Sequence, residues 1–340
     1  MPFKQFETFY KKFIFVFFMM AILAVGWVGI AFKYNNESNV DLSYQRYFND
    51  NYKIFSLNTP SELSFGGERV PLEMLDVRER MDRELLVNTY WQSQSLLFHK
   101  RANRWFPIIE PILKKNGVPD DFKYLAVIES GLTNAVSPAG ATGFWQLLRD
   151  TGQEFGLEIN DEIDERYHVE KSTEAACKYL KAAYRQYGNW TMAAASYNMG
   201  MNGLFRQTER QKVTDFYDLL LNEETSRYLF RILAAKEILS KPAQYGFHYR
   251  PRDLYTPYVI REQVIDTSVS DLADYAIEQG INYKVLKILN PWLRESFLTN
   301  PANKSYTIWL PADTAFGSMP FELNPEQNAV IDTLTTDSLK

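Results

Sequence analysis

A run of 20 residues without a charged side chain, Phe13 to Phe32, limits most strongly what this 340-residue chain can be. At about 1.5 Å per residue, a helix of this length spans about 30 Å, the thickness of a bilayer core. A cleaved signal peptide is the alternative interpretation. The run is longer than the apolar part of a usual signal peptide, and no small-x-small cleavage site follows it. We therefore expect an uncleaved transmembrane helix.

The charges beside this run predict its orientation. Lys4, Lys11 and Lys12 precede it, whereas only Lys33 follows closely. The positive-inside rule then places the N-terminus in the cytoplasm and roughly 300 following residues outside the cell membrane, on the periplasmic side. Nucleotide cofactors are scarce there, and no glycine-rich phosphate loop is present, so we expect no cofactor.

Composition excludes several classes of protein. Lys and Arg number 37 and Asp and Glu 42, a net charge of −5, which argues against a nucleic-acid partner. The single cysteine, Cys177, permits no internal disulfide. The three histidines lie far apart and without metal-ligand spacing, so we expect no metal site and no Ser-His-Asp hydrolase: His99, His168 and His248.

The patterning of the chain predicts a mainly α fold with a small C-terminal α+β part. Helical periodicity dominates from about residue 71 to 246 without period-two alternation, so this region is expected to be all-α. After Arg250 the order becomes strand, helix, helix, strand. The expected organisation is 1–33 cytoplasmic stub and anchor, 34–68 weakly structured linker, 69–250 helical domain, 251–315 C-terminal module and 316–340 tail.

One helix carries an informative carboxyl group. From Phe122 to Glu129 only Lys123 and Glu129 are charged, and a helix that is apolar almost all round is buried. Asp120 is the expected N-cap of this helix. A buried carboxylate is costly unless it is paired or protonated. Glu129 is therefore either a structural residue paired with an Arg or a backbone amide, or a general acid with a raised pKa.

Glycosidic bonds are what such an acid typically cleaves, usually with a second carboxylate as base or nucleophile. Four candidates follow in the sequence, and each is expected to be solvated or a helix cap: Asp150, Glu154, Asp164 and Glu165. A mechanism with one carboxyl group would need the substrate to supply the nucleophile.

Several motifs in order resemble the lytic transglycosylases with the goose-type lysozyme fold. They are Glu129-Ser130, then Ser137-Pro-Ala-Gly140-Ala-Thr-Gly143-Phe-Trp145-Gln146, and Ala194-Ala195-Ser196-Tyr197-Asn198-Met199-Gly200, with Asp164-Glu165-Arg166 and Trp190 between. The Phe-Trp-Gln form and Glu224-Thr225-x-x-Tyr228 look most like the membrane-bound D branch of this family. Residues 257 to 311 resemble more weakly a LysM module, a peptidoglycan binder.

Three departures from these patterns stand out. Ser196 replaces a common Ala, and Leu147 to Thr151 replaces the Met-Pro-Gly-Thr that often follows the Gln. Asp266 to Val269 stands where LysM modules have Gly-Asp-Thr-Leu, so glycan binding by this module is in doubt.

The resemblance implies a mechanism with one carboxyl group. Glu129 protonates the oxygen between N-acetylmuramic acid and N-acetylglucosamine, and the muramic 2-acetamido group stabilises the charge at the anomeric carbon. Ionised Glu129 then accepts a proton from that sugar's 6-hydroxyl as it attacks. The product is a 1,6-anhydromuramic end, and the implied partners are peptidoglycan glycan strands.

The resemblance also implies supporting residues, each with a structural alternative. Tyr197 hydrogen-bonds near Glu129 or the acetamido group, or packs in the core. Asn198 binds sugar or backbone, and Gln146 binds the substrate or braces its loop. Ser137 assists Glu129 or forms a turn with Pro138. Trp145 stacks on a sugar ring, or packs in the core, which we favour.

Three functions follow: a lytic transglycosylase, a lysozyme-like hydrolase that uses water instead of the 6-hydroxyl, and an inactive wall-binding scaffold. The lack of an evident second carboxylate disfavours the hydrolase. The presence of Glu129 with Gln146 and Tyr197 disfavours the scaffold.

Overall fold

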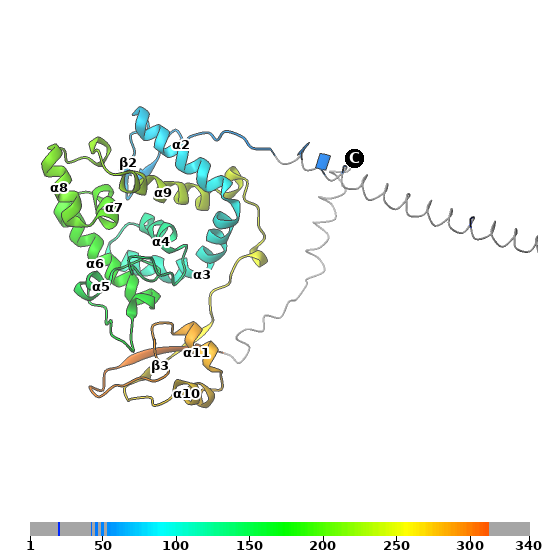
Figure 1. Ribbon diagram of the computed structural model, residues 1–340, viewed down its shortest axis with the longest axis vertical. Coiled ribbons are helices and arrows are strands. Elements are labelled where there is room, and N and C mark those ends of the chain that lie inside the picture. Colours follow the sequence, from blue (N-terminus) through cyan, green and yellow to red (C-terminus); the bar gives the residue numbers. More distant parts are fainter. Residues whose placement is uncertain (1–19, 21–41, 43–44, 47–48, 51–52, 313–340) are drawn as a thin grey trace, which may run out of the picture. The chain divides into compact units, whose positions relative to one another are not determined.

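The computed structural model describes residues 53–312, together with Met20, Leu42, Gln45, Arg46, Asn49 and Asp50 (Figure 1). The chain divides into two units between Ser56 and Leu57, and the architecture below is that of the unit beginning at Leu57. None of the helices in the described residues has the length and apolarity to span a bilayer. The predicted span, residues 13–32, lies outside the described residues except for Met20.

Helices dominate the first part of this unit, as predicted (Figure 1). Short 3-10 turns connect them: η1 (Asp120–Phe122), η2 (Glu165–Tyr167), η3 (Phe216–Asp218), η4 (Pro242–Tyr245) and η5 (Pro251–Asp253). The α-helices are α2 (Leu75–Tyr90), α3 (Gln92–Asn116), α4 (Lys123–Ser130), α5 (Arg149–Glu154), α6 (Val169–Tyr187), α7 (Trp190–Met199), α8 (Met201–Gln211) and α9 (Glu223–Ser240).

The central helix of this part is α9, which packs against α2, α4 and α7. In its middle, Leu229, Phe230 and Leu233 are fully buried. Beside it, Ala193, Ala194 and Ala195 of α7 are also fully buried and allow neighbouring helices to approach closely. Because α9 lies between α2 and α4, its polar side chains can reach groups on both.

A short hairpin precedes the helices, where a weakly structured linker was expected through residue 68. Strand β1 (Ser64–Phe65) pairs antiparallel with β2 (Glu68–Arg69), and Phe65 is fully buried. Gly66 and Gly67 have φ values of +58° and +84°, which a tight two-residue turn needs. The Glu68 carboxylate accepts from the backbone N–H groups of Trp190 (2.5 Å) and Thr191 (2.9 Å) at the start of α7. The linker prediction is wrong for these residues, because glycines that signal a loop here close a hairpin.

The C-terminal module has the predicted order of strand, helix, helix, strand. Strand β3 (Ile260–Ile265) is followed by α10 (Leu272–Glu278), α11 (Tyr283–Leu289) and β4 (Tyr306–Pro311). The strands pair antiparallel, with Ile260 opposite Pro311 and Ile265 opposite Tyr306. Leu272, Leu286, Ile308 and Leu310 form the fully buried centre of its own core.

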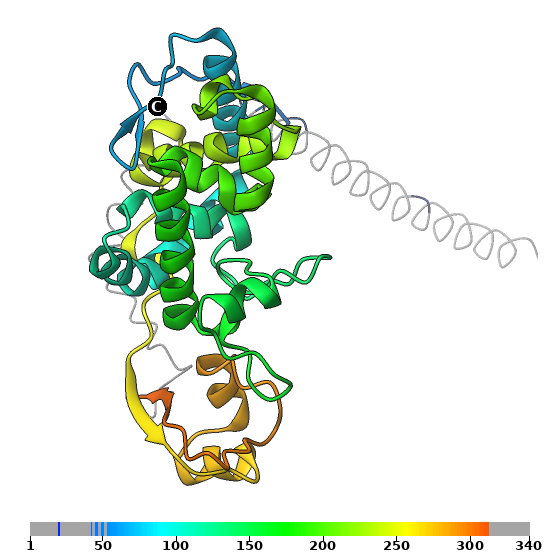
Figure 2. The same ribbon diagram turned by 90° about the vertical axis from the view of Figure 1, so that its left-hand side faces the viewer.

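The module packs directly on the helical part (Figure 2). Ile163, from the loop before η2, belongs to the module's core and forms a β-bridge with Leu293. Conversely, Leu289 and Trp309 of the module belong to the core of the helical part. The His168 ring contacts Trp292 and Trp309 at centroid distances of 5.9 and 5.8 Å, and burial lowers its pKa to about 3, so the ring is uncharged at neutral pH. The two parts therefore share buried side chains.

Candidate active site

Glu129 is the second-last residue of α4, a helix whose residues 124–127 are buried. Gly131 ends the helix in the left-handed conformation (φ +62°), and Leu132 follows with φ +57°, which is uncommon for a leucine. The expected cap is wrong, because the Asp120 carboxylate pairs with Lys123 Nζ (2.6 Å) and α4 has no side-chain cap. The buried length of α4 fixes where the half-buried Glu129 side chain emerges.

Two residues of α9 surround the Glu129 carboxyl group. The Tyr228 hydroxyl donates a short hydrogen bond to Glu129 Oε1. Arg231 Nη2 donates to the carbonyl of Ile128 (2.9 Å), which holds a positive charge beside the helix end. Burial raises the pKa of Glu129, the Tyr228 hydrogen bond and the Arg231 charge lower it, and the negative charge of Glu224 raises it further. The net direction is upward, so Glu129 keeps its proton to higher pH than an exposed glutamic acid.

Residues 135–147, here called the catalytic loop, pack against the end of α4. The Ser130 hydroxyl donates to the Phe144 carbonyl (2.9 Å), and the Gly143 amide donates to the Ala135 carbonyl (2.9 Å). Gly143 has φ +81°, and a Cβ there would lie 2.0 Å from the Arg166 carbonyl oxygen. Glycine is therefore required at this position for both backbone conformation and space.

Gln146 braces this loop from within. Its Nε2 donates to the carbonyls of Ala135 (3.0 Å) and Gly143 (2.9 Å), and its own φ is +46°. Ser137 likewise closes a turn, because its Oγ accepts from the Ala141 amide (3.0 Å). These hydrogen bonds are those expected if Gln146 braces its loop and Ser137 forms a turn. Neither set of hydrogen bonds excludes a contact of the side chain with substrate.

Tyr197 and Asn198, near the end of α7, also make protein contacts. The Tyr197 hydroxyl donates to the Trp145 carbonyl (2.8 Å), and burial and then the charge of Glu129 raise the pKa of this tyrosine well above its ordinary range. Asn198 donates to Glu224 Oε1 (3.1 Å) and accepts from Thr225 Oγ1 (2.7 Å). Tyr197 thus ties α7 to the catalytic loop beside Glu129.

Trp145 is a core residue and not a sugar-binding one. Its side chain has no exposed surface, and its Nε1 donates to Thr173 Oγ1 on α6 (2.8 Å). Stacking on a sugar ring would need an accessible face. Its candidate assignment as a substrate-binding residue is therefore wrong, and the core alternative holds.

Of the candidate second carboxylates, expected to be solvated or helix caps, only Glu165 has different surroundings. Asp164 and Glu165 are buried, at 7% and 4% exposure, and not solvated. Asp164 pairs with Arg166 (2.7 Å) and caps η2 by accepting from the Arg166 amide, while Glu165 pairs with Lys171. Asp150 and Glu154 are exposed as predicted. Since both buried carboxylates are already paired, neither is a free base.

Two influences on Glu129 were not predicted, the hydrogen bond from Tyr228 and the charge of Arg231. The motif containing Tyr228 was recognised only as a family feature, without a role. Tyr228 is 99 residues away from Glu129 in sequence, and only the packing of α9 on α4 brings them together. The motif was the only signal available for Tyr228, and Arg231 does not stand out on α9, which carries several other charged residues.

A cavity of about 290 Å³ lies between the helical part and the module. Its walls include Leu132, Thr133 and Asn134, which directly follow the site glutamate's helix, and aromatic rings from both parts: Trp105, Phe144, Tyr258, Trp292 and Trp309. Glu129 is not among its lining residues. Within the described part of the chain, no group of three His, Cys, Asp or Glu is placed to hold a metal ion.

Two family matches cover the regions that contain these features. Residues 106–220 match the transglycosylase SLT domain, and residues 261–314 match the soluble lytic transglycosylase C-terminal LysM-like domain. These matches identify, within the chain, a transglycosylase domain followed by a C-terminal domain of the kind found in soluble lytic transglycosylases. The SLT match contains Glu129, the catalytic loop and Tyr197, and it ends before Tyr228.

Individual relatives agree with this family. The chain is similar to membrane-bound lytic murein transglycosylase D of Escherichia coli, with 29% identity over 228 residues, 65% of this chain and 49% of that protein. It is also similar to a putative tributyltin chloride resistance protein of an Alteromonas species, with 29% identity over 108 residues, 31% of this chain and 52% of that one. The chain thus spans about half the length of these relatives.

A solved structure is also similar, that of an inactive mutant of lytic transglycosylase Slt from Pseudomonas aeruginosa. It shares 18% identity, covers 44% of this chain and 26% of its own, and superposes with a TM-score of 0.32.

Proposed function

We propose that this chain is a peptidoglycan lytic transglycosylase, which cleaves the β-1,4 bond between N-acetylmuramic acid and N-acetylglucosamine without net hydrolysis. The environment of Glu129 supports the proposal most directly. The carboxyl group sits at the end of a buried helix, and its pKa is raised by burial. Such a group retains the proton that a general acid must donate.

The proposed reaction needs two proton transfers, and the carboxyl group of Glu129 carries out both. In the first, Glu129 donates its proton to the glycosidic oxygen, and the bond from that oxygen to the muramic anomeric carbon breaks. In the second, the muramic 6-hydroxyl attacks the same carbon and gives its proton to Glu129, which restores the acid. The substrate supplies the nucleophile, so no second carboxylate is needed.

The contacts from α9 suit the intermediate stage of this cycle, when Glu129 is ionised. The hydrogen bond from Tyr228 and the positive charge of Arg231 both stabilise a carboxylate. Burial favours the neutral acid, and these two groups limit that preference. Glu129 is therefore balanced between the two forms that it must adopt in turn.

The remaining site residues take two roles in the proposal. Gln146 and Asn198, whose amides are half-buried, are proposed to bind the sugar acetamido or hydroxyl groups. Tyr197 and Ser137 act on substrate indirectly, by holding the catalytic loop that forms one side of the site.

The place of action proposed is the periplasmic side of the cell membrane, with residues 13–32 as an uncleaved anchor. The uncharged run supports this location, as does the excess of lysines before it. The Escherichia coli relative is also named as a membrane-bound murein transglycosylase. The proposed partners are glycan strands and the membrane.

A lysozyme-like hydrolase is the second candidate, and one observation favours it. The Glu224 carboxylate is exposed and close enough to raise the pKa of Glu129. A carboxylate in that position could activate a water molecule.

Analysis of the products distinguishes these functions. Full-length protein in detergent is incubated with purified sacculi, and the released fragments are analysed by mass spectrometry before and after borohydride reduction. Anhydro ends, which borohydride leaves unchanged, support the transglycosylase, whereas reducible ends that disappear in Glu224→Gln support the hydrolase. Glu129→Gln should lower the rate by about 10²-fold or more, because the amide has no proton to donate. A wild-type protein without either product would leave only the wall-binding scaffold.

A further inference from the structure

The Arg166 side chain fastens the turn of the catalytic loop from outside. Its Nη1 donates to the carbonyls of Gly140 (3.0 Å) and Leu147 (3.2 Å), which lie on opposite sides of the loop's turn. The backbone of Arg166 also touches the loop, since its carbonyl oxygen occupies the space where Gly143 would carry a Cβ. The position of the loop relative to Arg166 is therefore fixed at three points.

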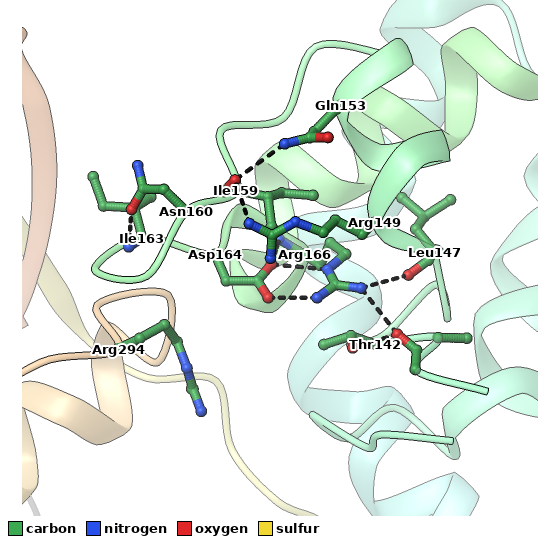
Figure 3. Close-up of polar contacts among 12 residues, drawn as sticks. Thr142, Leu147, Arg149, Gln153, Ile159, Asn160, Ile163, Asp164, Arg166 and Arg294 are labelled. Carbon is green, nitrogen blue, oxygen red and sulfur yellow. Dashed lines mark hydrogen bonds and ion pairs between the residues drawn. The ribbon is translucent and has the colours of Figure 1, made fainter. Parts of the chain in front are cut away.

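Arg166 is in turn oriented by Asp164. Nε donates to Asp164 Oδ1 (2.9 Å) and Nη2 to Oδ2 (2.7 Å), a bidentate pair in which both residues are buried (Figure 3). The planar guanidinium has a fixed arrangement of donors. When the carboxylate occupies one edge, the remaining Nη1 can point only toward the loop.

Asp164 lies in a segment that pairs with the C-terminal module. Its amide donates to the Trp292 carbonyl (2.9 Å), and the Arg294 amide donates to the Glu162 carbonyl (2.7 Å). Between these bonds, Ile163 is buried in the module's core. At the outer end, Glu162 Oε2 accepts from the Thr299 amide (2.6 Å). The backbone of Asp164 is thus held by the module.

We propose that the C-terminal module is a positioning element of the active site, which acts through Asp164 and Arg166 on the catalytic loop. The loop reaches the end of Glu129's helix through the Ser130–Phe144 bond and reaches α7 through the Tyr197–Trp145 bond. Arg166 is a positioning residue in this scheme, and it contacts no substrate. The inference rests on the proposed function of Glu129 and adds a contribution of the module to the rate.

The test weakens this connection at its exposed outer end. Glu162→Ala removes the acceptor for the Thr299 amide and leaves the backbone pairing in place. Asp161→Ala is the matched control, because Asp161 is the neighbouring acidic residue, is exposed, and has no side-chain bond among the described residues. Arg166→Lys weakens the connection at its centre, since lysine keeps the charge but loses the planar fork.

Turnover is measured with full-length protein on sacculi, from the release of anhydro fragments across a pH series. Glu162→Ala should lower kcat about threefold and Arg166→Lys about tenfold, with KM little changed, because a misplaced catalytic loop disturbs the reacting geometry. A looser loop also admits water to Glu129, and water stabilises the ionised carboxylate. The alkaline limb of the pH profile should therefore move to lower pH. The double variant should lose less than the product of the two single effects, because both act on one connection.

The outcomes separate this inference from the proposed function. An inactive wild-type protein would overturn the function itself. An active wild type in which Glu162→Ala matches Asp161→Ala in both kcat and pH profile would overturn the positioning role alone. Independent, multiplicative effects of Glu162→Ala and Arg166→Lys would do the same. If Arg166→Lys fails to fold, as near-UV circular dichroism would reveal, the comparison of Glu162→Ala with Asp161→Ala decides.

Discussion

At the scale of single residues, the proposed chemistry depends on the side chains that α9 places beside Glu129. The carboxyl group is made a weaker acid by burial, while Tyr228 and Arg231 act in the opposite direction. These opposing influences make two measurable properties of the protein depend on pH, its stability and its rate.

Glu129→Gln should stabilise the protein at neutral pH. A carboxyl group whose pKa is raised on folding contributes full stability below its unfolded pKa, and loses it as pH rises through the folded pKa. The raised pKa of Glu129, above its ordinary value of 4.5, gives it this sign. Glutamine avoids the ionisation, so the variant should melt at a higher temperature at pH 7, with the difference vanishing near pH 4. Calorimetry over this range tests it, and a variant less stable at pH 7 would contradict the direction of the shift.

Tyr228→Phe should move the alkaline limb of the pH–rate profile to higher pH. The hydroxyl stabilises ionised Glu129, so its loss raises the pKa of the carboxyl group and preserves the acid form further into the alkaline range. The maximum rate should fall about tenfold, because the carboxyl group also loses an orienting contact. Tyr217→Phe is a suitable control, since it also removes a buried tyrosine hydroxyl, but one beside the charges of Asp215 and Glu68. An unmoved alkaline limb would separate Tyr228 from the titration of Glu129.

The sequence was sufficient to predict Glu129 as a candidate, because one charged residue on an apolar helix can be recognised from adjacent positions. It was insufficient for Tyr228, whose role depends on the packing of two helices distant in the chain. Trp145 illustrates a different limit: an aromatic residue beside a motif has the same sequence whether it faces a groove or Thr173.

At the scale of elements, the catalytic loop is held in place by side chains that donate hydrogen bonds to its backbone carbonyl groups. Gln146, Tyr197 and Arg166 each bind its backbone, so its shape depends on partners as well as on its own residues. Two of these residues are glycines, Gly140 and Gly143. Their unequal importance was not predicted, because it depends on Arg166, which lies outside the loop.

Gly143→Ala should be far more damaging than Gly140→Ala. Both glycines have φ near +80°, so both substitutions introduce backbone strain of about 1 kcal/mol or more. Only at Gly143 would the added Cβ lie 2.0 Å from the Arg166 carbonyl oxygen, whereas at Gly140 nothing lies within 4 Å. We expect Gly143→Ala to lower the unfolding free energy by about 3 kcal/mol or more and to remove most activity. Denaturant titration of both variants measures this, and equal losses would mean that strain alone matters.

At the scale of the whole described unit, the C-terminal module is joined to the helical part by shared core residues. The order of its elements could be predicted from periodicity and β-branched runs. Its attachment could not, because Ile163 resembles any loop isoleucine until Leu293 is placed beside it. A module known only from its resemblance to a LysM peptidoglycan binder would be expected to be a helper that can be removed without affecting the core.

Deletion of all residues after Arg250 should therefore destabilise the helical part. Ile163 and His168, at 2% and 6% exposure, would lose their covering, and Trp309 and Leu289 would leave the main core. Burial of one large apolar side chain contributes about 1.5–3 kcal/mol, so we expect a loss of at least about 3 kcal/mol. Thermal melting of the truncated and full-length proteins tests this. An unchanged melting temperature, with full activity on short glycans, would restore the view of the module as an independent helper.

The hairpin ahead of α2 has a mechanical consequence. Glu68 binds the first amides of α7, and α7 carries Tyr197 and Asn198 toward its other end. A protein tethered to a membrane on one side and gripping a rigid wall on the other is under tension whenever the two move apart. With the proposed anchor, that load would enter through the chain preceding the hairpin and first reach two other contacts, the Ser64 carbonyl with Lys236 of α9 and the Gly66 amide with Asp121 ahead of α4. The hairpin would then transmit the load to α4, α7 and α9 together, the three helices that hold Glu129 and Tyr197.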